Sequence, residues 1–345
     1  MTEQSAAKLA TLADVARLAG VSAMTVSRVV NEPAKVSPAT QERVQQAMDQ
    51  LRYRPNVMAQ SLVRGRSRTI GVVTFDTAQY GPAAALLGIE RAARERGYGV
   101  AIAAIERADH ASLRDAVHSL DDRLVDGLVI IAPFVSTAGA LRSLDRRTPV
   151  VLAGAGHAGE APIVGIDQGK GASLATRHLL DLGHRTVHHV AGPSDWIESR
   201  LRTDGWRAAL EAAAAAAPPP IEGDWSPLSG YNAGLLLAND PQTTAVFVAN
   251  DQMALGVLSA FHERGIRVPE DVSIVGFDDT PESAFYTPAL TTVRQDFILL
   301  GEVAVELLDR LVADEGSTAP VKHLIEPQLV IRASTGRMRQ DHPHS

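Results

Sequence analysis

Apolar positions recur at helical spacing near the start of the chain. The first stripe consists of Leu12, Val15, Ala16 and Ala19. Because these positions are spaced i, i+3, i+4 and i+7, they share one face of a helix. Thr11 and Asp14 have the spacing of a capping pair at the start of this helix, and Gly20 permits the sharp turn that ends it.

Two further amphipathic segments follow. Ser22 is placed to cap a helix that turns Val26 inward, and Ser37 with Pro38 opens a third helix that closes a small core. Two short helices around a glycine turn form a helix-turn-helix, in which the start of the second helix meets base edges in the major groove. An ordinary helical hairpin has the same spacing. The candidate DNA-binding residues in this unit are Thr11, Ser22, Ala23, Met24, Thr25, Ser27, Arg28 and Asn31.

The segment after the third helix is short and basic. Pro55 ends that helix, and residues 56–63 give barely two helical turns before Gly65. So short a helix is unstable alone in water and forms only when something else holds it. From the residues alone, a solvated basic linker is the simpler interpretation. The candidate residues of a hinge helix are Asn56, Ala59, Gln60 and Leu62.

From Thr69 the pattern changes to apolar runs that alternate with amphipathic helices. This alternation predicts βαβ units and parallel sheets that helices cover on both faces. It begins again after the run IVGID at 163–167, so we expect two doubly wound α/β lobes. The expected helices cover residues 83–96, 111–121, 138–146, 170–181, 198–216, 230–238, 252–263 and 299–312.

The charge of the chain is unevenly distributed. The 345 residues carry a formal net charge of −7, yet residues 1–68 hold ten Lys and Arg against five Asp and Glu. The remainder therefore has a net charge of −12. A basic arm on an acidic body is typical of a DNA-binding headpiece attached to a domain that does not bind DNA.

Several classes of protein are disfavoured by what the sequence lacks. The chain has no cysteine, so disulfides, thiol catalysis and cysteine metal sites are excluded. It also lacks a membrane-length apolar run, the apolar segment of a secretion signal, a nucleophile elbow, zinc-ligand spacing and a P-loop. We therefore expect a cytoplasmic protein that is no enzyme, has no metal or cofactor, and does not contact a membrane.

One short motif suggests a nucleotide site but has the wrong context. Gly154, Gly156 and Gly159 spell G-x-G-x-x-G directly after an apolar strand. A dinucleotide phosphate needs the N-terminus of a helix at this point, whereas Pro162 and another apolar strand follow here. A loop at the edge of a ligand cleft is the better interpretation.

Polar side chains gather where the predicted strands of the body end. Ligands bind beyond the carboxyl ends of parallel strands, and two lobes facing one another enclose a cleft. A sugar suits such a site, because charged groups bind its hydroxyls and aromatic rings pack on its apolar face. A salt bridge between the lobes and plain core aromatics explain the same residues equally well. The candidates are Arg202, Trp225, Asn250, Asp251, Asp278, Gln295 and Phe297.

Long, ordered motifs resemble one family. LADVA at 12–16, VSRVVN at 26–31 and RPNVMAQSLVRG at 54–65 resemble the DNA-binding end of the lac repressor and galactose repressor (LacI/GalR) family of bacterial transcriptional regulators. The body is similar as well, in runs such as SRLRTDGW, VANDQMALG and LTTVRQDF. The resemblance implies a paired hinge helix, in which Ala59 allows close approach of the partner's helix and Leu62 enters the minor groove of operator DNA.

The resemblance also implies an order of domains. A helix-turn-helix headpiece would be followed by a hinge helix and an effector domain of two doubly wound lobes, like those of periplasmic sugar-binding proteins. The missing export signal and the headpiece argue against a transport protein. The expected boundaries are 1–54 for the headpiece, 55–67 for the hinge and linker, 68–167 plus 293–323 for the first lobe, 168–292 plus 324–337 for the second lobe, and 338–345 for a tail.

For the effector, the resemblance implies that Arg202, Asn250 and Asp278 bond sugar hydroxyls. The apolar side of the binding site would be formed by Pro82, Trp225 and Phe297. A close member of the family carries an aspartate where this chain has Gly154, with Asp76 as a candidate replacement; the difference bears on which sugar is accepted.

The function implied is that of a repressor which a sugar inducer, best a β-galactoside or related glycoside, releases from a palindromic operator. A regulator that needs a corepressor is the alternative. The end of the chain, RMRQDHPHS, has no leucine heptads, so we expect a homodimer and not a tetramer.

Overall fold

The computed structural model describes residues 10–54, 66–75, 78–105, 109–131, 148–155, 161–313 and 321–338. Its contacts divide the chain into two units, residues 1–68 and residues 69–345. Several sequence-based predictions lie outside the described residues. These are Asn56, Ala59, Gln60, Leu62, Asp76, Gly156, Gly159 and the helix over 138–146.

In its described part, the first unit is a bundle of three short helices, α1 (Leu12–Ala19), α2 (Ala23–Asn31) and α3 (Pro38–Gln50), with a 3₁₀ turn at Pro33–Lys35. Thr11 and Asp14 form the expected capping box, and Gly20 ends α1 in the left-handed conformation. Ser37 differs from expectation, because its hydroxyl bonds that of Thr40 and not a backbone N–H. The buried core consists of Val15, Ala16, Ala19, Val26, Val44, Ala47 and Met48.

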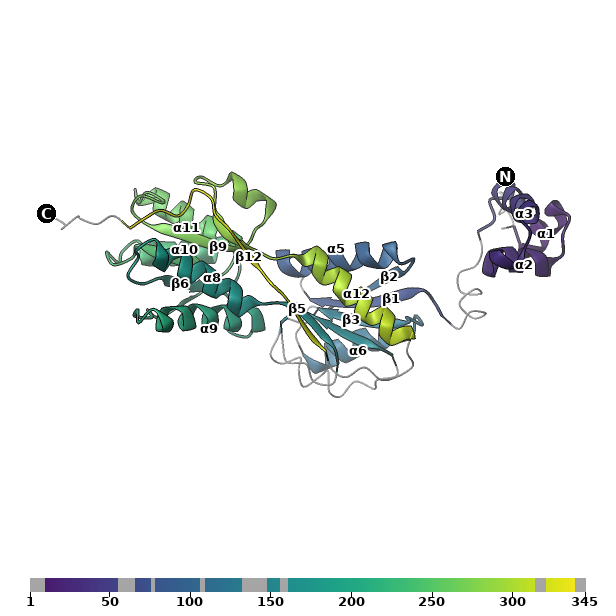
Figure 1. Ribbon diagram of the computed structural model, residues 1–345, viewed down its shortest axis with the longest axis horizontal. Coiled ribbons are helices and arrows are strands. Elements are labelled where there is room, and N and C mark those ends of the chain that lie inside the picture. Colours follow the sequence, from purple (N-terminus) through teal and green to yellow (C-terminus); the bar gives the residue numbers. More distant parts are fainter. Residues whose placement is uncertain are drawn as a thin grey trace, which may run out of the picture. The chain divides into compact units, whose positions relative to one another are not determined.

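The second unit begins with a six-stranded parallel sheet in the order β11-β5-β4-β3-β1-β2. Helices cover it on both faces (Figure 1), with separate apolar clusters above and below the sheet. The strands are β1 (Thr69–Phe75), β2 (Gly99–Ile105), β3 (Gly127–Ile131), β4 (Val150–Ala153), β5 (Ile163–Ile166) and β11 (Lys322–Ile325), and the helices are α5 (Tyr80–Glu95), α6 (His110–Asp121) and α12 (Phe297–Ala313).

A second six-stranded sheet forms the other lobe, in the order β12-β10-β9-β8-β6-β7. Only β12, among the described strands, runs antiparallel to its neighbour. The strands are β6 (His188–Ala191), β7 (Ile221–Glu222), β8 (Ala245–Val248), β9 (Ser273–Asp278), β10 (Thr291–Arg294) and β12 (Gln328–Val330). The helices are α8 (Gln168–Asp181), α9 (Ile197–Ala212), α10 (Pro227–Leu237), α11 (Asp251–Glu263) and a 3₁₀ turn at Pro281–Phe285. Two doubly wound lobes are therefore confirmed.

The chain passes between the two lobes three times, after β5, after β10 and after β11 (Figure 1). β10 belongs to the second sheet through Arg294, and β11 belongs to the first sheet through Ile325. The expected boundaries at 292/293 and 323/324 fall inside these two strands. They need correction by about two residues, because a strand completes its pairing with the sheet before the chain can leave it.

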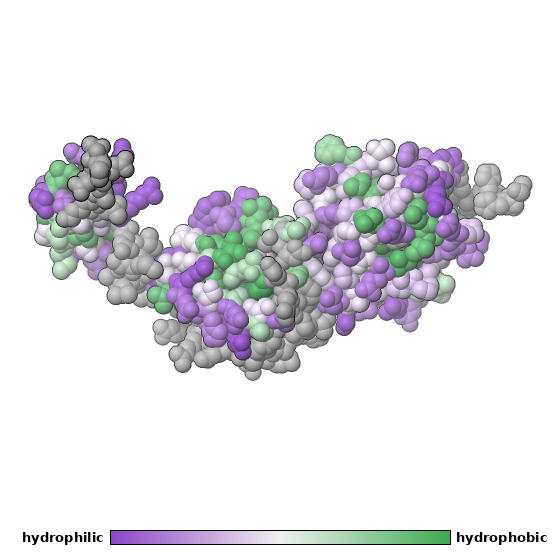
Figure 2. All heavy atoms as spheres, turned by 180° about the vertical axis from the view of Figure 1, so that it is seen from behind, coloured by the Kyte–Doolittle hydropathy of each residue, from purple (hydrophilic) through white to green (hydrophobic). Residues whose placement is uncertain are grey.

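Some apolar surface stays exposed on the second unit. Figure 2 shows apolar side chains gathered in several places on this face of the body. Among the described residues of this unit, the large apolar side chains with the highest exposure are Phe285 (86%) and Leu228 (69%). No described helix is long and apolar enough to cross a membrane.

Candidate functional site

The helix that would read DNA begins with a well-formed cap. Ser22 precedes α2, and its hydroxyl accepts the N–H of Thr25. Ala23, Met24 and Arg28 are exposed, with Met24 at 63%. These side chains are therefore available to base edges at the start of the helix, as the sequence predicts.

The other candidates on this unit make local hydrogen bonds. The Thr11 hydroxyl forms the capping box with Asp14, because it donates to the Asp14 carboxylate and accepts the Asp14 N–H. The Asn31 amide donates to the Ser27 hydroxyl over 3.3 Å. Contacts of all these residues with DNA stay a prediction.

A cleft lies between the two lobes of the second unit. Its empty volume of about 700 Å³ includes solvent at its mouth. The structure brings together seven predicted effector residues around this cleft. They are Pro82, Arg202, Trp225, Asn250, Asp278, Gln295 and Phe297.

Four buried side chains form a closed polar ring at the cleft, from α8, α9, β9 and the segment between β10 and α12. Arg202 Nε donates to Gln168 Oε1 over 2.8 Å, and Gln168 Nε2 donates to Gln295 Oε1 over 2.8 Å. Gln295 Nε2 donates to Asp278 Oδ1 over 2.6 Å, and this oxygen lies 3.6 Å from Arg202 Nη2. The ring fixes the orientation of each polar group before any ligand arrives.

The ring corrects one sequence-based alternative. Arg202 and Asp278 do form an ion pair, but both partners belong to the second lobe, on α9 and β9. The pair therefore does not join the lobes. Gln168, at the start of α8, was missed because a glutamine after a strand carries no signal of its own in the sequence.

Burial controls the charge state of the ring. It raises the pKa of Asp278 to about 6, against the opposing effect of the Arg202 guanidinium and the Gln295 amide. Burial also lowers the pKa of Arg202, while Asp278 raises it. Arg202 is held further by a hydrogen bond from Nη1 to the Ala249 carbonyl, and it lies over the ring of Phe277 at 3.9 Å from the centroid.

Asn250 and Trp225 are tied to each other. Asn250 caps α11 by accepting the N–H of Met253, and its amide donates to the Trp225 carbonyl over 3.0 Å. Trp225 has a positive φ of 72°, and its ring packs on Gly192, where any Cβ would lie 2.2 Å from it. Glycine at 192 is therefore needed for the ring to enter the cleft wall.

Aromatic rings line the cleft on both sides. Trp196 meets Trp225 edge to face at 5.4 Å between centroids, and Tyr80 meets Phe297 in the same way at 5.9 Å. The sequence-based analysis missed Trp196 and Tyr80. Trp196 immediately precedes α9 and Tyr80 begins α5, so a signal existed in their position at helix starts that face the strand ends.

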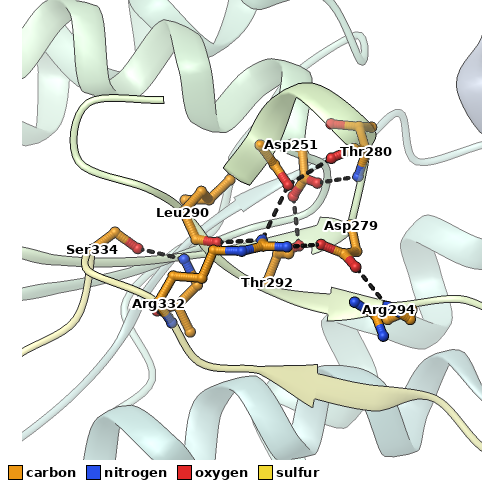
Figure 3. A network of polar contacts seen from close by, with 10 residues as sticks. Asp251, Asp279, Thr280, Leu290, Thr292, Arg294, Arg332 and Ser334 are labelled. Atoms are coloured by element: carbon orange, nitrogen blue, oxygen red, sulfur yellow. Dashed lines mark hydrogen bonds and ion pairs between the residues drawn. The ribbon is translucent and has the colours of Figure 1, made fainter. Parts of the chain in front are cut away.

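A second polar network lies at the end of β9 (Figure 3). Asp279 accepts hydrogen bonds from Arg294 (2.6 Å) and Arg332 (2.5 Å), and Arg332 also donates to the Leu290 carbonyl. These contacts tie the segment after β12 to the end of β9. They fix the backbone next to Asp278.

Asp251 lies in the same region but makes its own contacts. It accepts the hydroxyl of Thr292 (2.6 Å) and the N–H of Thr280 (2.8 Å), as Figure 3 shows. Burial and the neighbouring Asp278 raise its pKa to about 8. It does not line the cleft, so its part is to support the segment that carries Asp278.

The glycine motif does not open a helix where the structure describes it. Gly154 follows β4 with a φ of 137°, and β5 begins at Ile163. A Cβ at Gly165 would lie 2.3 Å from the Gly154 carbonyl, so the two strands approach closely here. Among the described residues no cluster of His, Asp and Glu side chains suits a metal ion.

Comparisons with known proteins agree with this architecture. The pattern of "Bacterial regulatory proteins, lacI family" matches residues 11–56, and that of "Periplasmic binding protein-like domain" matches residues 176–335. The chain is 38% identical to the lactose operon repressor of Escherichia coli (strain K12), over 95% of this chain and 91% of the relative.

It is also 35% identical to the HTH-type transcriptional repressor PurR of Haemophilus influenzae, over 94% of this chain and 98% of the relative. A crystal structure of the lac repressor bound to ONPG in the repressed state superposes with a TM-score of 0.87 at 37% identity. It covers 95% of this chain and 100% of that one.

Proposed function

Because this chain belongs to the lacI family of bacterial regulatory proteins, we propose that it is a repressor which a sugar releases from its operator. The observation that supports a sugar as the ligand is the closed polar ring beside aromatic walls. The ring consists of Arg202, Gln168, Gln295 and Asp278. Preset hydrogen-bonding groups next to flat apolar surfaces suit a ligand with fixed hydroxyls and an apolar ring face.

We take a β-galactoside or related glycoside as the inducer. Support comes from the relative named lactose operon repressor and from the similar structure bound to ONPG. Gly154 is a difference at the cleft that bears on the identity of the sugar.

The proposed assembly is a homodimer on a palindromic operator. Each headpiece reads one half-site, so a twofold dimer needs a site with the same symmetry. A repressor acts on the chromosome, which agrees with a cytoplasmic location.

Release follows if the sugar favours a setting of the lobes that separates the paired hinge helices. They then melt, Leu62 leaves the minor groove, and operator affinity falls. Such coupling is reciprocal, so operator DNA weakens sugar binding by the same factor.

Band-shift titration tests the proposal. Operator fragments are first selected from random duplex DNA with the full chain, and the complex is then titrated with lactose and with phenyl β-galactoside. We expect release of the DNA. The variant Arg28→Ala is the matched control, because it should weaken DNA binding and leave sugar binding unchanged. Unchanged operator binding at saturating sugar refutes induction.

The second candidate is control of the opposite sign, in which the ligand tightens operator binding. The similarity to the repressor PurR is nearly as high as that to the lactose operon repressor. If the ligand tightens operator binding in the same titration, the protein is a corepressor-dependent regulator and the induction model is wrong.

A further inference from the structure

A carboxyl group from the second lobe reaches the strand end that carries Gly154. Glu198 lies in the first turn of α9, and its Oε1 accepts the N–H of Ala155 over 3.2 Å. Ala155 follows β4 in the first lobe. A Cβ built at Gly154 would lie 3.5 Å from the same oxygen. Glu198 therefore occupies the space beside position 154 and joins the two lobes.

Position 154 itself is poorly suited to carry a polar side chain. Its φ of 137° lies in a region that L residues rarely adopt. An acidic group at this corner of the cleft is therefore more easily supplied by a neighbour than by residue 154. Glu198 is that neighbour, and both residues line the cleft.

Two cleft atoms lack a hydrogen-bond partner within the described part of the chain. Glu198 Oε2 is an acceptor and Trp225 Nε1 is a donor, and neither is accessible to solvent. Buried polar atoms are nearly always paired, and both residues line the cleft, so the two side chains gain partners if they turn toward a ligand that both donates and accepts. Sugar hydroxyls donate and accept.

We propose that Glu198 is the residue by which this cleft selects a neutral sugar: one hydroxyl donates to Oε2 of Glu198, and a sugar oxygen accepts from Trp225 Nε1. The inference rests on the proposed function, because it assumes that the cleft holds a sugar. It names Glu198 Oε2 as the atom that discriminates between sugars. It also implies that sugar phosphates bind less tightly than neutral sugars. Arg202 already donates hydrogen bonds to Gln168 and to the Ala249 carbonyl and pairs with Asp278, so it does not neutralise a phosphate beside Glu198.

The charge state of Glu198 agrees with this role. Burial raises its pKa to about 7, against the opposing effects of the backbone N–H groups of Glu198 and Ala155 and of Arg202. Among the described residues, the other titratable groups lining the cleft are Tyr80 on α5, Arg202 on α9 and Asp278 on β9. A hydroxyl donating to Oε2 favours the ionised carboxylate, so sugar affinity should rise with pH, by up to about tenfold between pH 6 and pH 8.

The test is a titration of the full chain with lactose, followed by the fluorescence of the cleft tryptophans. We expect Glu198→Ala to weaken lactose binding roughly tenfold to a hundredfold. We expect Glu198→Gln to lose the pH dependence between pH 6 and pH 8. Glu211→Gln, an exposed residue on the same helix, is the matched control and should change neither. Thermal unfolding of each variant shows whether it is folded.

The outcomes separate this inference from the proposed function. If the unaltered chain does not bind lactose, the assignment of a β-galactoside is overturned, and the inference falls with it. If lactose binds the unaltered chain and both folded Glu198 variants equally, or if Glu198→Gln keeps the pH dependence, Glu198 only joins the lobes and the inference is wrong. Tighter binding of galactose 6-phosphate than of galactose by the unaltered chain also overturns it.

Discussion

The two lobes face the same cleft with different chemistry. The described wall of the first lobe is mostly apolar, with Ala85, Ile131 and Leu300 on it, whereas the second lobe contributes the polar ring around Arg202. A ligand is therefore oriented by one lobe and enclosed by the other. This division explains how a ligand fixed on the second lobe can set the position of the first, since only the enclosing wall has to move.

Removing the charge at the centre of the ring should have the largest effect. Arg202→Met leaves Asp278 and the two glutamines without their cation, and breaking a buried pair costs about 3–5 kcal/mol. We expect this loss in urea unfolding at pH 7, together with a loss of lactose binding of at least about a hundredfold. Arg207→Met, on the exposed face of α9, is the control. Equal effects in the two variants would contradict the ring's importance.

A buried carboxyl of the second lobe outside the cleft should also make stability depend on pH. Burial raises the pKa of Asp251 from 3.8 to about 8, so the folded chain holds a proton that the unfolded chain releases. The resulting stability is fully present below about pH 4 and is lost as the pH rises through about 8. We expect the free energy of unfolding to fall by about 2 kcal/mol between pH 6 and pH 8.5. In Asp251→Asn this fall should largely disappear, and a fall of unchanged size would count against a protonated Asp251.

On the apolar wall, size should matter more than chemistry. Ala85 is buried at 4% exposure in the cleft lining, and Ala85→Leu takes up space that the ligand uses. We expect lactose affinity to fall about tenfold and that of galactose by less, because the larger sugar needs more room. Titrating both sugars measures the difference. A larger loss for galactose would show that this wall does not select by size.

The smallest effect is expected for a hydroxyl on the apolar wall. Tyr80 meets Phe297 with its ring, and burial raises the pKa of its phenol, which therefore stays neutral. Tyr80→Phe keeps the ring and should change stability by less than about 0.5 kcal/mol and lactose affinity by less than about threefold. An effect as large as that of Arg202→Met would remove the distinction between the two walls.

Local signals predicted the elements of the fold well. The cap at Thr11 begins α1 and the turn at Gly20 ends it. Both lie next to the helix in the chain, so the sequence shows them directly. The errors lie at boundaries. We expected a helix from residue 83, whereas α5 begins at Tyr80, because a proline in the first turn of a helix does not interrupt it.

The cleft was predictable only in part. Asp278 ends β9 and Arg202 lies on α9, and both carry charges in motifs of the family, so they stand out in the sequence. The link between Gln168 and Gln295 joins residues 127 positions apart, and no local pattern indicates it. Glu198 was missed for a similar reason, because its proposed role depends on the absence of a side chain at Gly154, 44 residues earlier in the chain.

The three passages of the chain between the lobes determine the order in which the lobes are completed during synthesis. The first lobe starts at β1, but α12 and β11 leave the ribosome only after most of the second lobe. Until then α5 lacks the partner against which Gly88 and Gly301 bring the two helices into backbone contact. Both lobes are therefore completed only when the last segments emerge, β11 for the first lobe and β12 for the second, and until then the nascent first lobe exposes an apolar helix face.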